Sequence, residues 1–329
     1  MVKFTAGIDL GGTSIKAVLV DQNNEVKGYL KRAVQAELGP REVTRQMMGM
    51  VYTLLGENKL VPADLRGLGL GVPGLVDRRE EKAVFLPNLP GWHHIPLGQW
   101  IREELDVPLL LDNDVRMAAW GEKLLGAGRG WDDMVCITVG TGIGAGIFLQ
   151  GKMFRGHGES AGEIGHMTVE KDGLLCTCGN QGCLEMYASG RAIARKAREL
   201  VKQKGFNLIL ELVEGDEARI TAATVARAAE LGDSKAQGII EEAARYLGIG
   251  LANLANILNP RRIVIGGGVA GMGERLLGPV REVVQARAMP VNRDVEIVAA
   301  QLGELAGALG AALVARCRLA DGKEKLKEI

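Results

Sequence analysis

Two segments of this sequence share one layout: an apolar run, a glycine-rich turn and a second apolar run. The first spans Phe4 to Val20 around the turn Leu10-Gly-Gly-Thr13. The second spans Met134 to Leu149 around the turn Gly140-Thr-Gly-Ile-Gly144. Apolar runs joined by glycine-containing turns are typical of β-hairpins. The repetition indicates an internal duplication in which each half of the chain opens with a hairpin.

Predicted strands alternate with predicted helices after each hairpin. In the first half we expect a third strand after Asp21-Gln-Asn-Asn24, helices at 41–55 and 97–105, a strand ending in Gly69-Leu-Gly-Val-Pro-Gly74, and a strand at 108–111. In the second half we expect helices at 190–204 and 234–258, a strand at 262–265, a helix after Gly271, a strand at 295–299 and a helix at 304–319. This alternation indicates an α/β protein.

The length of 329 residues suggests two domains. We expect a small α/β domain of residues 1–112 plus 301–329 and a large one of 113–300, joined by short hinges and packed across a cleft. Forty basic and forty acidic residues give zero net charge, which favours neither nucleic acid nor an anionic membrane as a partner. The most apolar stretch is too short to span a bilayer, and no targeting signal is present, so we expect a cytoplasmic protein.

Three cysteines and a histidine lie within eighteen residues, namely His166, Cys176, Cys178 and Cys183. Three thiolates and one imidazole form a closed tetrahedral zinc set without an open position for water, so the sequence predicts a structural zinc in the loop 166–183. Gly179 and Gly182 would let this loop fold back tightly. A chance cluster of thiols is the alternative, because Cys-x-Cys is a less common ligand spacing than Cys-x-x-Cys.

A disulfide is disfavoured for these cysteines. Cys136 and Cys317, the other two, lie in apolar segments that we expect to be core, and a chain without a secretory signal is expected to be reduced. His157 is expected to be a loop histidine in solvent rather than a further ligand.

The first hairpin carries groups that suit a nucleotide. Glycine turns present backbone N–H groups to an anion, as phosphate sites require. Asp9, at the end of a strand, could hold a hydrated Mg²⁺, and Thr13 and Lys16 offer a hydroxyl and an ammonium for phosphate oxygens. An ordinary hairpin turn is the alternative.

A glycine-rich segment near the C-terminus matches a dinucleotide-binding pattern. Gly266-Gly-Gly268-Val-Ala-Gly271 follows a predicted strand and precedes a predicted helix. The acid expected about twenty residues later is missing, and too little chain remains to complete such a domain. The same glycines could lie beneath an adenosine at the start of a helix.

Asp114 is the candidate general base. If a bound nucleotide transfers a phosphoryl group to a hydroxyl, which is a poor nucleophile, a carboxylate must accept the proton of that hydroxyl. Asp114 follows the apolar strand 108–111 and begins a predicted helix through Leu125. The alternative is that Asp112, Asn113 and Asp114 only cap that helix.

Six motifs together resemble those of the ROK family of sugar kinases, and in particular its bacterial glucokinases. They are Asp9-x-Gly-Gly-Thr-x-x-Lys16, Gly71-Val-Pro-Gly-Leu-Val-Asp77, Asn88-Leu-Pro-Gly-Trp92, Asp112-Asn-Asp114, Glu163-Ile-Gly-His166 and Cys176-x-Cys-Gly-x-x-Gly-Cys-Leu-Glu185. The resemblance spans most of the chain. It implies an actin-like, hexokinase-type fold of two ribonuclease-H-like domains that bind ATP and a hexose.

The resemblance also implies the roles of individual residues. The sugar would be bound by Gly74, Asn88, Asn113, Asp114, Glu163, His166 and Glu185. Mg–ATP would be bound by Asp9, Gly11, Gly12, Thr13, Lys16, Thr141, Gly142, Gly266, Gly267 and Gly268. His166 would bind zinc through one ring nitrogen and face a sugar hydroxyl with the other. Trp92 is expected to pack the loop of Asn88 rather than to stack on the sugar.

The resemblance implies transfer of the γ-phosphoryl group of Mg–ATP to the 6-hydroxyl of D-glucose. The resemblance and the base rates for soluble enzymes also predict that the protein is a homo-oligomer, namely a dimer. Mannose, fructose, N-acetylmannosamine and N-acetylglucosamine remain alternative sugars, and ADP or polyphosphate alternative donors. A sugar-sensing repressor is disfavoured, because the first strand begins by Phe4 and leaves no room for a DNA-binding module before it.

Overall fold

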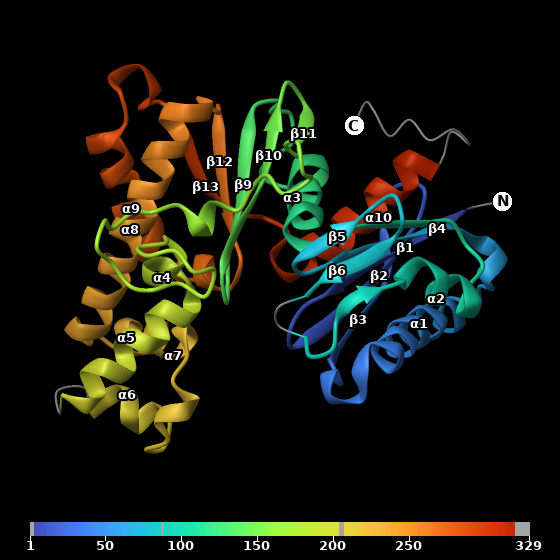
Figure 1. Cartoon of the computed structure of the whole chain (residues 1–329), viewed down its shortest axis with the longest axis horizontal. Coiled ribbons are helices and arrows are strands. Elements are labelled where there is room, and N and C mark those ends of the chain that lie inside the picture. The colour runs from blue at the N-terminus through green and yellow to red at the C-terminus, as the bar shows by residue number, and fades with distance from the viewer. Residues whose placement is uncertain (1–2, 87–88, 204–206, 320–329) are drawn as a thin grey trace. The chain divides into compact units, whose positions relative to one another are not determined.

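The structure is a computed structural model that describes residues 3–86, 89–203 and 207–319. It forms two compact units (Figure 1). Unit 1 contains Met1–Gly130 and Gln301–Ile329, and unit 2 contains Trp131–Ala300. The division falls after residue 130 and not after residue 112, because the helix that follows residue 113 packs within unit 1.

Unit 1 contains a five-stranded sheet in the order β3-β2-β1-β4-β8. Its strands are β1 (Phe4–Leu10), β2 (Ser14–Val20), β3 (Val26–Ala33), β4 (Leu65–Val72) and β8 (Leu109–Asn113). The first three form the predicted antiparallel meander, and β4 and β8 join it in parallel. Its helices are α1 (Gly39–Glu57), α2 (Leu97–Glu104), α3 (Asp114–Leu125) and α10 (Ala306–Leu319), with 3₁₀ turns η1 (Ala36–Leu38), η2 (Pro62–Asp64) and η7 (Gly303–Leu305).

The alternation of side chains along β1 separates the two faces of this sheet. Ala6, Ile8 and Leu10 pack into the core beneath α1 and α2. Gly7 and Asp9 point to the opposite face, where α10 lies. A Cβ on Gly7 would lie 2.0 Å from the carbonyl oxygen of Ala308, so the helix rests directly on the backbone of the strand. Asp9 is therefore held at the end of the sheet, on the face covered by α10.

Helix α10 also packs against α3 at very short range. A Cβ on Gly310 would lie 1.7 Å from the carbonyl oxygen of Met117, and one on Gly121 would lie 2.4 Å from that of Ala306. Only glycine permits this approach of two helix backbones. The contact places α3 in unit 1 and is the reason for the boundary at residue 130.

A second, three-stranded antiparallel sheet belongs to unit 1. It contains β5 (Leu75–Asp77), β6 (Lys82–Phe85) and β7 (His93–Ile95), in that order. The sequence analysis did not predict it, because strands of three or four residues are too short to show a period. It carries the segment after Gly74 and the two ends of the loop that contains Asn88.

The sheet of unit 2 repeats the order of the first. Its order is β11-β10-β9-β12-β13, with strands β9 (Met134–Val139), β10 (Ile143–Leu149), β11 (Lys152–Phe154), β12 (Arg262–Gly266) and β13 (Glu296–Ala299). Again the first three strands are antiparallel and the last two are parallel to the first. The predicted duplication is confirmed.

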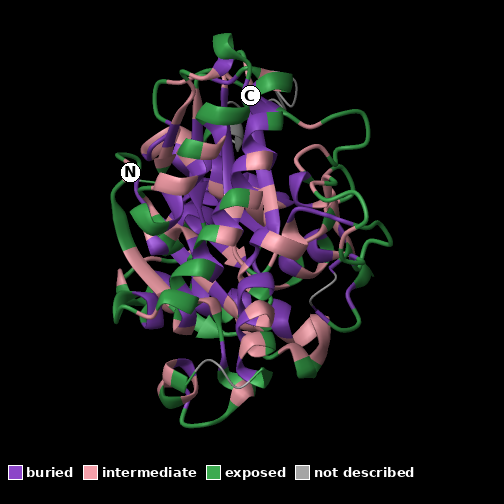
Figure 2. Cartoon of the chain, turned by 90° about the vertical axis from the view of Figure 1, so that its left-hand side faces the viewer, coloured by how far each residue is buried: buried purple, intermediate pink, exposed green. Residues whose placement is uncertain are grey.

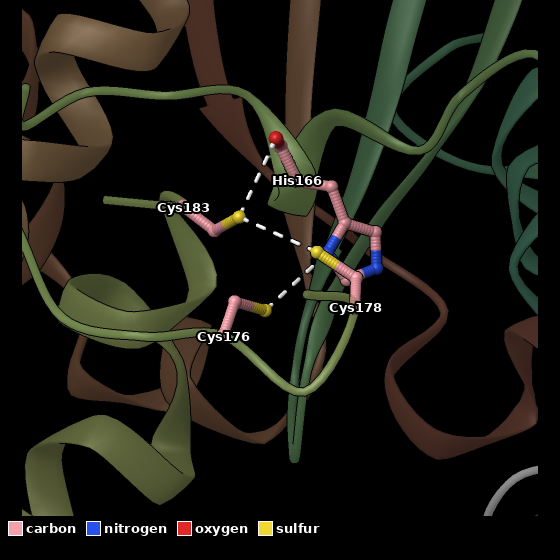
Figure 3. A group of neighbouring side chains, drawn as sticks. All are labelled: His166, Cys176, Cys178 and Cys183. Atoms are coloured by element: carbon pink, nitrogen blue, oxygen red, sulfur yellow. Dashed lines mark hydrogen bonds between the residues drawn. The ribbon is translucent and has the colours of Figure 1, made fainter. Parts of the chain in front are cut away.

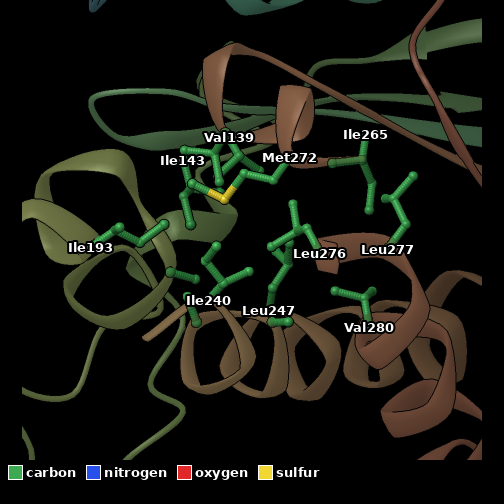
Figure 4. Packing of buried hydrophobic residues seen from close by; sticks show 14 of the residues in the cluster. Val139, Ile143, Ile193, Ile240, Leu247, Ile265, Met272, Leu276, Leu277 and Val280 are labelled. Carbon is green, nitrogen blue, oxygen red and sulfur yellow. The ribbon is translucent and has the colours of Figure 1, made fainter. Parts of the chain in front are cut away.

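The core of unit 2 lies between its helices and one face of the second sheet. The helices are α4 (Glu185–Ala188), α5 (Gly190–Lys202), α6 (Asn207–Leu212), α7 (Ala222–Glu230), α8 (Ser234–Leu258) and α9 (Glu274–Arg287), with 3₁₀ turns η3 (Ile164–His166), η4 (Glu217–Arg219), η5 (Gly268–Met272) and η6 (Pro290–Asn292). Leu247 of α8 and Leu276 and Val280 of α9 pack in one cluster with Val139 and Ile265 of the strands (Figure 4). Buried and exposed positions alternate along the helices, as amphipathic helices require (Figure 2).

The longest helix, α8, has clear signals at both ends. The Asp233 carboxylate caps its first turn by accepting the N–H groups of Lys235 and Ala236. Asn259 ends it in the left-handed conformation, directly before Pro260. Every helix and strand predicted from the sequence is present within two or three residues of its expected ends. None of the helices in the described ranges is both long and apolar enough to cross a membrane.

Candidate functional site

In unit 1 the predicted nucleotide residues lie at the turn between β1 and β2. The N–H of Gly11 donates to the carbonyl of Ser14, which closes the turn and leaves Gly12 and Thr13 exposed. Asp9 and Lys16 face each other across the two strands, with Nζ 3.3 Å from Oδ2. Burial raises the pKa of Asp9, although Lys16 opposes the shift. A buried carboxylate beside a glycine turn suits a phosphate that carries a metal ion. The metal cation would offset the free-energy cost of keeping the buried carboxylate negatively charged.

Asp9 lies in one cross-strand row with the segment of the candidate base. Asp9 pairs with Gly71 of β4, and Gly71 pairs with Asp112 of β8. Neighbouring strands are about 4.8 Å apart, so Asp9 and Asp112 are separated by about 10 Å along one edge of the sheet. Gly71 lies between them in close contact with α3, because a Cβ on Gly71 would lie 3.2 Å from the Cα of Asp114.

The turn from β8 into α3 presents Asn113 and Asp114. Asn113 is the N-cap of α3, and its Oδ1 accepts the N–H of Arg116 at 3.2 Å. Its Nδ2 donates to the carbonyl of Gly74 at 3.2 Å, so two predicted sugar-binding residues are in direct contact. Asp114 is half-buried at the first position of the helix and accepts the N–H of Val115 at 2.8 Å. The capping hypothesis is thus correct for Asn113, and the role of Asp114 as a base stays a prediction.

Asp112, which the sequence analysis placed only in a cap, is a buried carboxylate between two arginines. Its Oδ2 lies 3.4 Å from Nε of Arg78, and its Oδ1 lies 3.3 Å from Nη1 of Arg116. The i,i+4 spacing of Asp112 and Arg116 at a helix start was a signal for one of these contacts. Nothing in the sequence indicated Arg78, because the contact joins two different sheets.

In unit 2 the predicted nucleotide residues meet at one edge of the second sheet. Thr141 and Gly142 form the turn between β9 and β10, in which the N–H of Gly140 donates to the carbonyl of Gly142 at 2.9 Å. Gly266 ends β12, and Gly267 has φ +85°. A Cβ on Gly267 would lie 2.4 Å from the carbonyl oxygen of Val139, directly before that turn. Gly267 and Gly268 are exposed.

The four predicted zinc ligands converge on one point (Figure 3). Their ligand atoms all lie within 4.8 Å of one another. The Sγ atoms of Cys178 and Cys183 are 3.7 Å apart, and the Sγ of Cys176 lies 3.7 Å from Nδ1 of His166. Zinc–sulfur bonds of about 2.3 Å separate two sulfurs of a tetrahedral site by about 3.8 Å. The donor set and its spacing therefore fit a closed tetrahedral zinc.

The loop brings these ligands together by folding back on itself. The N–H of Gly182 donates to the carbonyl of Leu174 at 2.9 Å. Gly179 and Gly182 have φ of +91° and +73°, and a Cβ on Gly182 would strike the carbonyl oxygen of Glu170 at 1.7 Å. The predicted need for these two glycines is confirmed.

The three thiols differ in their environments. Burial raises the pKa of Cys183 to about 12, and burial also raises the pKa of Cys176. A hydrogen bond from the Asn180 backbone lowers the pKa of the exposed Cys178. A zinc ion would supply the positive charge that stabilises all three as thiolates.

The cluster of predicted zinc ligands includes one predicted sugar residue, His166, and adjoins another, Glu185. Nδ1 of His166 faces the cluster, and its other ring nitrogen points away from the sulfurs (Figure 3). Oε1 of Glu185, at the start of α4, lies 3.8 Å from that Nδ1 and 3.4 Å from the Sγ of Cys176. Its Oε2 would lie 2.9 Å from a Cβ on Gly142. Glu185 thus links the zinc cluster to the glycine turn of the second hairpin.

Glu163 precedes η3 and is exposed. The segment that carries Glu163 and His166 lies on β10, because the N–H of Ala145 donates to the carbonyl of Gly162 at 2.9 Å. A Cβ on Gly165 would lie 2.3 Å from the carbonyl oxygen of Ile143. The second hairpin therefore fixes the position of this loop.

The remaining candidate residues have mixed outcomes. Asn88 lies outside the described residues. Trp92 is fully buried in one core cluster with Leu89, as its predicted packing role requires. His157 is exposed, as expected. Cys136 is buried as predicted, but Cys317 is exposed near the end of α10, so the expectation that it belongs to the core was wrong.

These features define the class of the protein. Two α/β units, each built on a sheet of the same order and each with a glycine turn at one sheet edge, form the actin-like, hexokinase-type fold. The model of the ROK family matches residues 5–318. The chain belongs to the ROK family.

The sequence similarity to proteins of known name covers almost the whole chain. A glucokinase of Streptomyces coelicolor is 36% identical over 316 residues, which are 95% of this chain and 97% of that protein. A xylose repressor of Caldicellulosiruptor bescii is 34% identical over 85% of this chain and 70% of the repressor. A ROK family glucokinase from Streptomyces griseus, solved in complex with glucose and AMPPNP, has a TM-score of 0.84 and 37% identity and covers 95% of this chain and 99% of that one.

Proposed function

We propose that this protein is an ATP-dependent glucokinase, which transfers the γ-phosphoryl group of Mg–ATP to the 6-hydroxyl of D-glucose. The observation that carries the proposal is the turn between β8 and α3, in which Asp114 directly follows Asn113 and the side-chain amide of Asn113 donates to the carbonyl of Gly74. A base must lie within hydrogen-bond reach of the hydroxyl that it deprotonates, and an adjacent amide can orient that hydroxyl. The named relatives support glucose as the sugar.

In this proposal Asp114 accepts the proton of the sugar hydroxyl as the phosphorus–oxygen bond forms. Gly74, Asn88, Asn113, Glu163, His166 and Glu185 bind the sugar. Asp9, Gly11, Gly12, Thr13 and Lys16 of unit 1 and Thr141, Gly142 and Gly266 to Gly268 of unit 2 bind the nucleotide. Mg²⁺, when bound with ATP, neutralises charge on the transferred phosphoryl group. Zinc, held by His166, Cys176, Cys178 and Cys183, shapes the sugar-binding loop and takes no part in the transfer.

The test is a coupled assay of ADP release with Mg–ATP and a panel of glucose, mannose, fructose, N-acetylglucosamine and N-acetylmannosamine. Asp114→Asn is run beside the wild type, because it keeps the shape of the side chain and removes the base. We expect glucose to be the best substrate and the variant to lose at least a hundredfold in kcat. Replacing ATP by ADP or polyphosphate in the same assay identifies the donor.

Each other outcome has a definite meaning. Turnover of only an N-acetylated sugar would keep the mechanism and change the substrate. Glucose binding by calorimetry without turnover of any sugar would instead favour a sugar sensor, the second candidate, which the similarity to xylose repressors supports. Full activity of Asp114→Asn would refute the assignment of the base.

A further inference from the structure

The most buried charge next to the proposed active site is not among the residues proposed to touch the substrate. Asp112 is 1% exposed, and the arginines on either side are also largely buried, Arg116 at 7% and Arg78 at 12%. Arg116 lies in the first turn of α3, and Arg78 follows β5 in the small sheet. Two different sheets of unit 1 thus meet at one carboxylate.

A buried ion pair of this kind is a poor way to stabilise a fold. Removing a carboxylate and a guanidinium from water costs several kcal/mol per ion, and apolar side chains of similar volume often stabilise a core as well or better. What a buried pair does supply is a fixed geometry, because a planar guanidinium accepts few orientations of its carboxylate. The segments that the pair joins are therefore the ones whose relative position it holds.

Two contacts join the same two segments. The Arg78–Asp112 ion pair, at 3.4 Å, links the end of β5 to the end of β8. The hydrogen bond from Nδ2 of Asn113 to the carbonyl of Gly74, at 3.2 Å, links the start of β5 to the start of α3. Gly74, Asn113 and Asp114 are the residues proposed to bind and deprotonate the sugar. Asp112 directly precedes Asn113 in the chain, and Arg78 follows Gly74 by four residues.

We propose that Asp112, held by Arg78 and Arg116, is a positioning residue for Asn113 and Asp114. The pair fixes the distance between β5, which directly follows Gly74, and the β8–α3 turn, which carries the base. It acts through these residues and does not touch the substrate. The inference rests on the proposed function, since it concerns the same sugar site.

The test compares Arg78→Met, which removes the ion pair, with Arg79→Met, which changes the neighbouring exposed arginine. We expect kcat with glucose to fall at least tenfold in Arg78→Met, because a displacement of about 1 Å at a reacting group can cost a hundredfold. KM for glucose should rise several-fold, whereas KM for Mg–ATP should stay within twofold. Arg79→Met should match the wild type in all three values.

Two further variants separate positioning from stability. Arg78→Lys keeps the positive charge, and we expect it to recover only part of the lost kcat, because an ammonium cannot hold the carboxylate as a planar guanidinium does. Asp112→Asn keeps the shape of the side chain and should lower kcat as Arg78→Met does. Each kcat is divided by the folded fraction, which is measured by circular dichroism.

The proposal would be overturned if Arg78→Met, Arg78→Lys and Asp112→Asn all kept the wild-type kcat per folded molecule. In that case the substitutions would lower only the unfolding temperature. A wild type that binds glucose without turnover would refute the kinase and not the positioning. In that case the same variants are compared by calorimetry, and a glucose Kd unchanged from wild type in Arg78→Met would then overturn the positioning as well.

Discussion

The carboxylate of Glu122, in α3, accepts the backbone N–H of Gln301, which lies 179 residues later in the chain, at 3.0 Å from Oε1 and 3.1 Å from Oε2. It also accepts the N–H groups of Leu302 and Ala127, each at 2.8 Å, and it is 1% exposed. Unit 1 ends at Gly130 and resumes at Gln301. One buried side chain therefore holds both connecting segments where they join unit 1.

We expect Glu122→Gln to destabilise unit 1 by about 2 kcal/mol, because the amide turns a donor towards backbone donors and leaves at least one of them unsatisfied. Trp92, Trp100 and Trp120 lie in unit 1, so urea unfolding followed by tryptophan fluorescence reports mainly on this unit. Glu57→Gln, an exposed position in α1, is the control. Equal urea midpoints for Glu122→Gln and Glu57→Gln would contradict the stabilising role of Glu122.

Gly307→Ala should impair the nucleotide site without unfolding the protein. The new Cβ would lie 2.7 Å from Cγ of Asp9, so either the carboxylate or α10 must move. We expect KM for Mg–ATP to rise at least fivefold. Gly49→Ala, where a Cβ meets nothing within 4 Å, should leave the kinetics unchanged. A wild-type KM in Gly307→Ala would show that the position of Asp9 does not matter for the nucleotide.

Asp9→Asn should remove activity without lowering the stability of the ligand-free protein at neutral pH. Burial raises the pKa of Asp9 above its usual range, so the folded state binds this proton more tightly than the unfolded state does. Such a group opposes folding once the pH exceeds its unfolded pKa, and that cost is fully present above its folded pKa. Thermal unfolding of both proteins at pH 7 checks this. A clearly lower unfolding temperature of Asp9→Asn would contradict it.

Gly142→Ala should raise KM for glucose, although Gly142 is proposed to bind the nucleotide. Its Cβ would lie 2.9 Å from Oε2 of Glu185 and would displace that carboxylate. Gly140→Ala, in the same turn, would meet nothing within 4 Å and serves as the matched control. If KM for glucose in Gly142→Ala equals that of the control, Glu185 does not contribute to glucose binding.

Cys178→Ser should lower both zinc content and sugar affinity. The variant removes one of four ligands, and the loop that carries His166 and Glu185 would lose the constraint on its shape. Zinc is measured by colorimetric release, stability by thermal unfolding and affinity by KM for glucose. The exposed Cys317→Ser is the control. Loss of zinc with an unchanged KM would show that the metal does not shape the sugar site.

The sequence determined the long regular elements and the local motifs, but not short elements such as β5, β6 and β7. The hairpins around Gly11 and Gly142, the helices and the tight zinc loop follow from apolar periodicity, glycine turns and ligand spacing, which are properties of neighbouring residues. The convergence of Cys176, Cys178, Cys183 and His166 could be predicted because all four lie in one short loop.

The tertiary structure alone decided the contacts between distant segments. The contacts of Arg78 with Asp112, of Glu122 with Gln301 and of Gly307 with Asp9 form because helices and strands pack side by side. No local sequence pattern predicts which segments will be neighbours. The division at residue 130 has the same origin, since it follows from the backbone contact of Gly310 with Met117. Local residue preferences fix the elements, whereas burial and close packing select their partners.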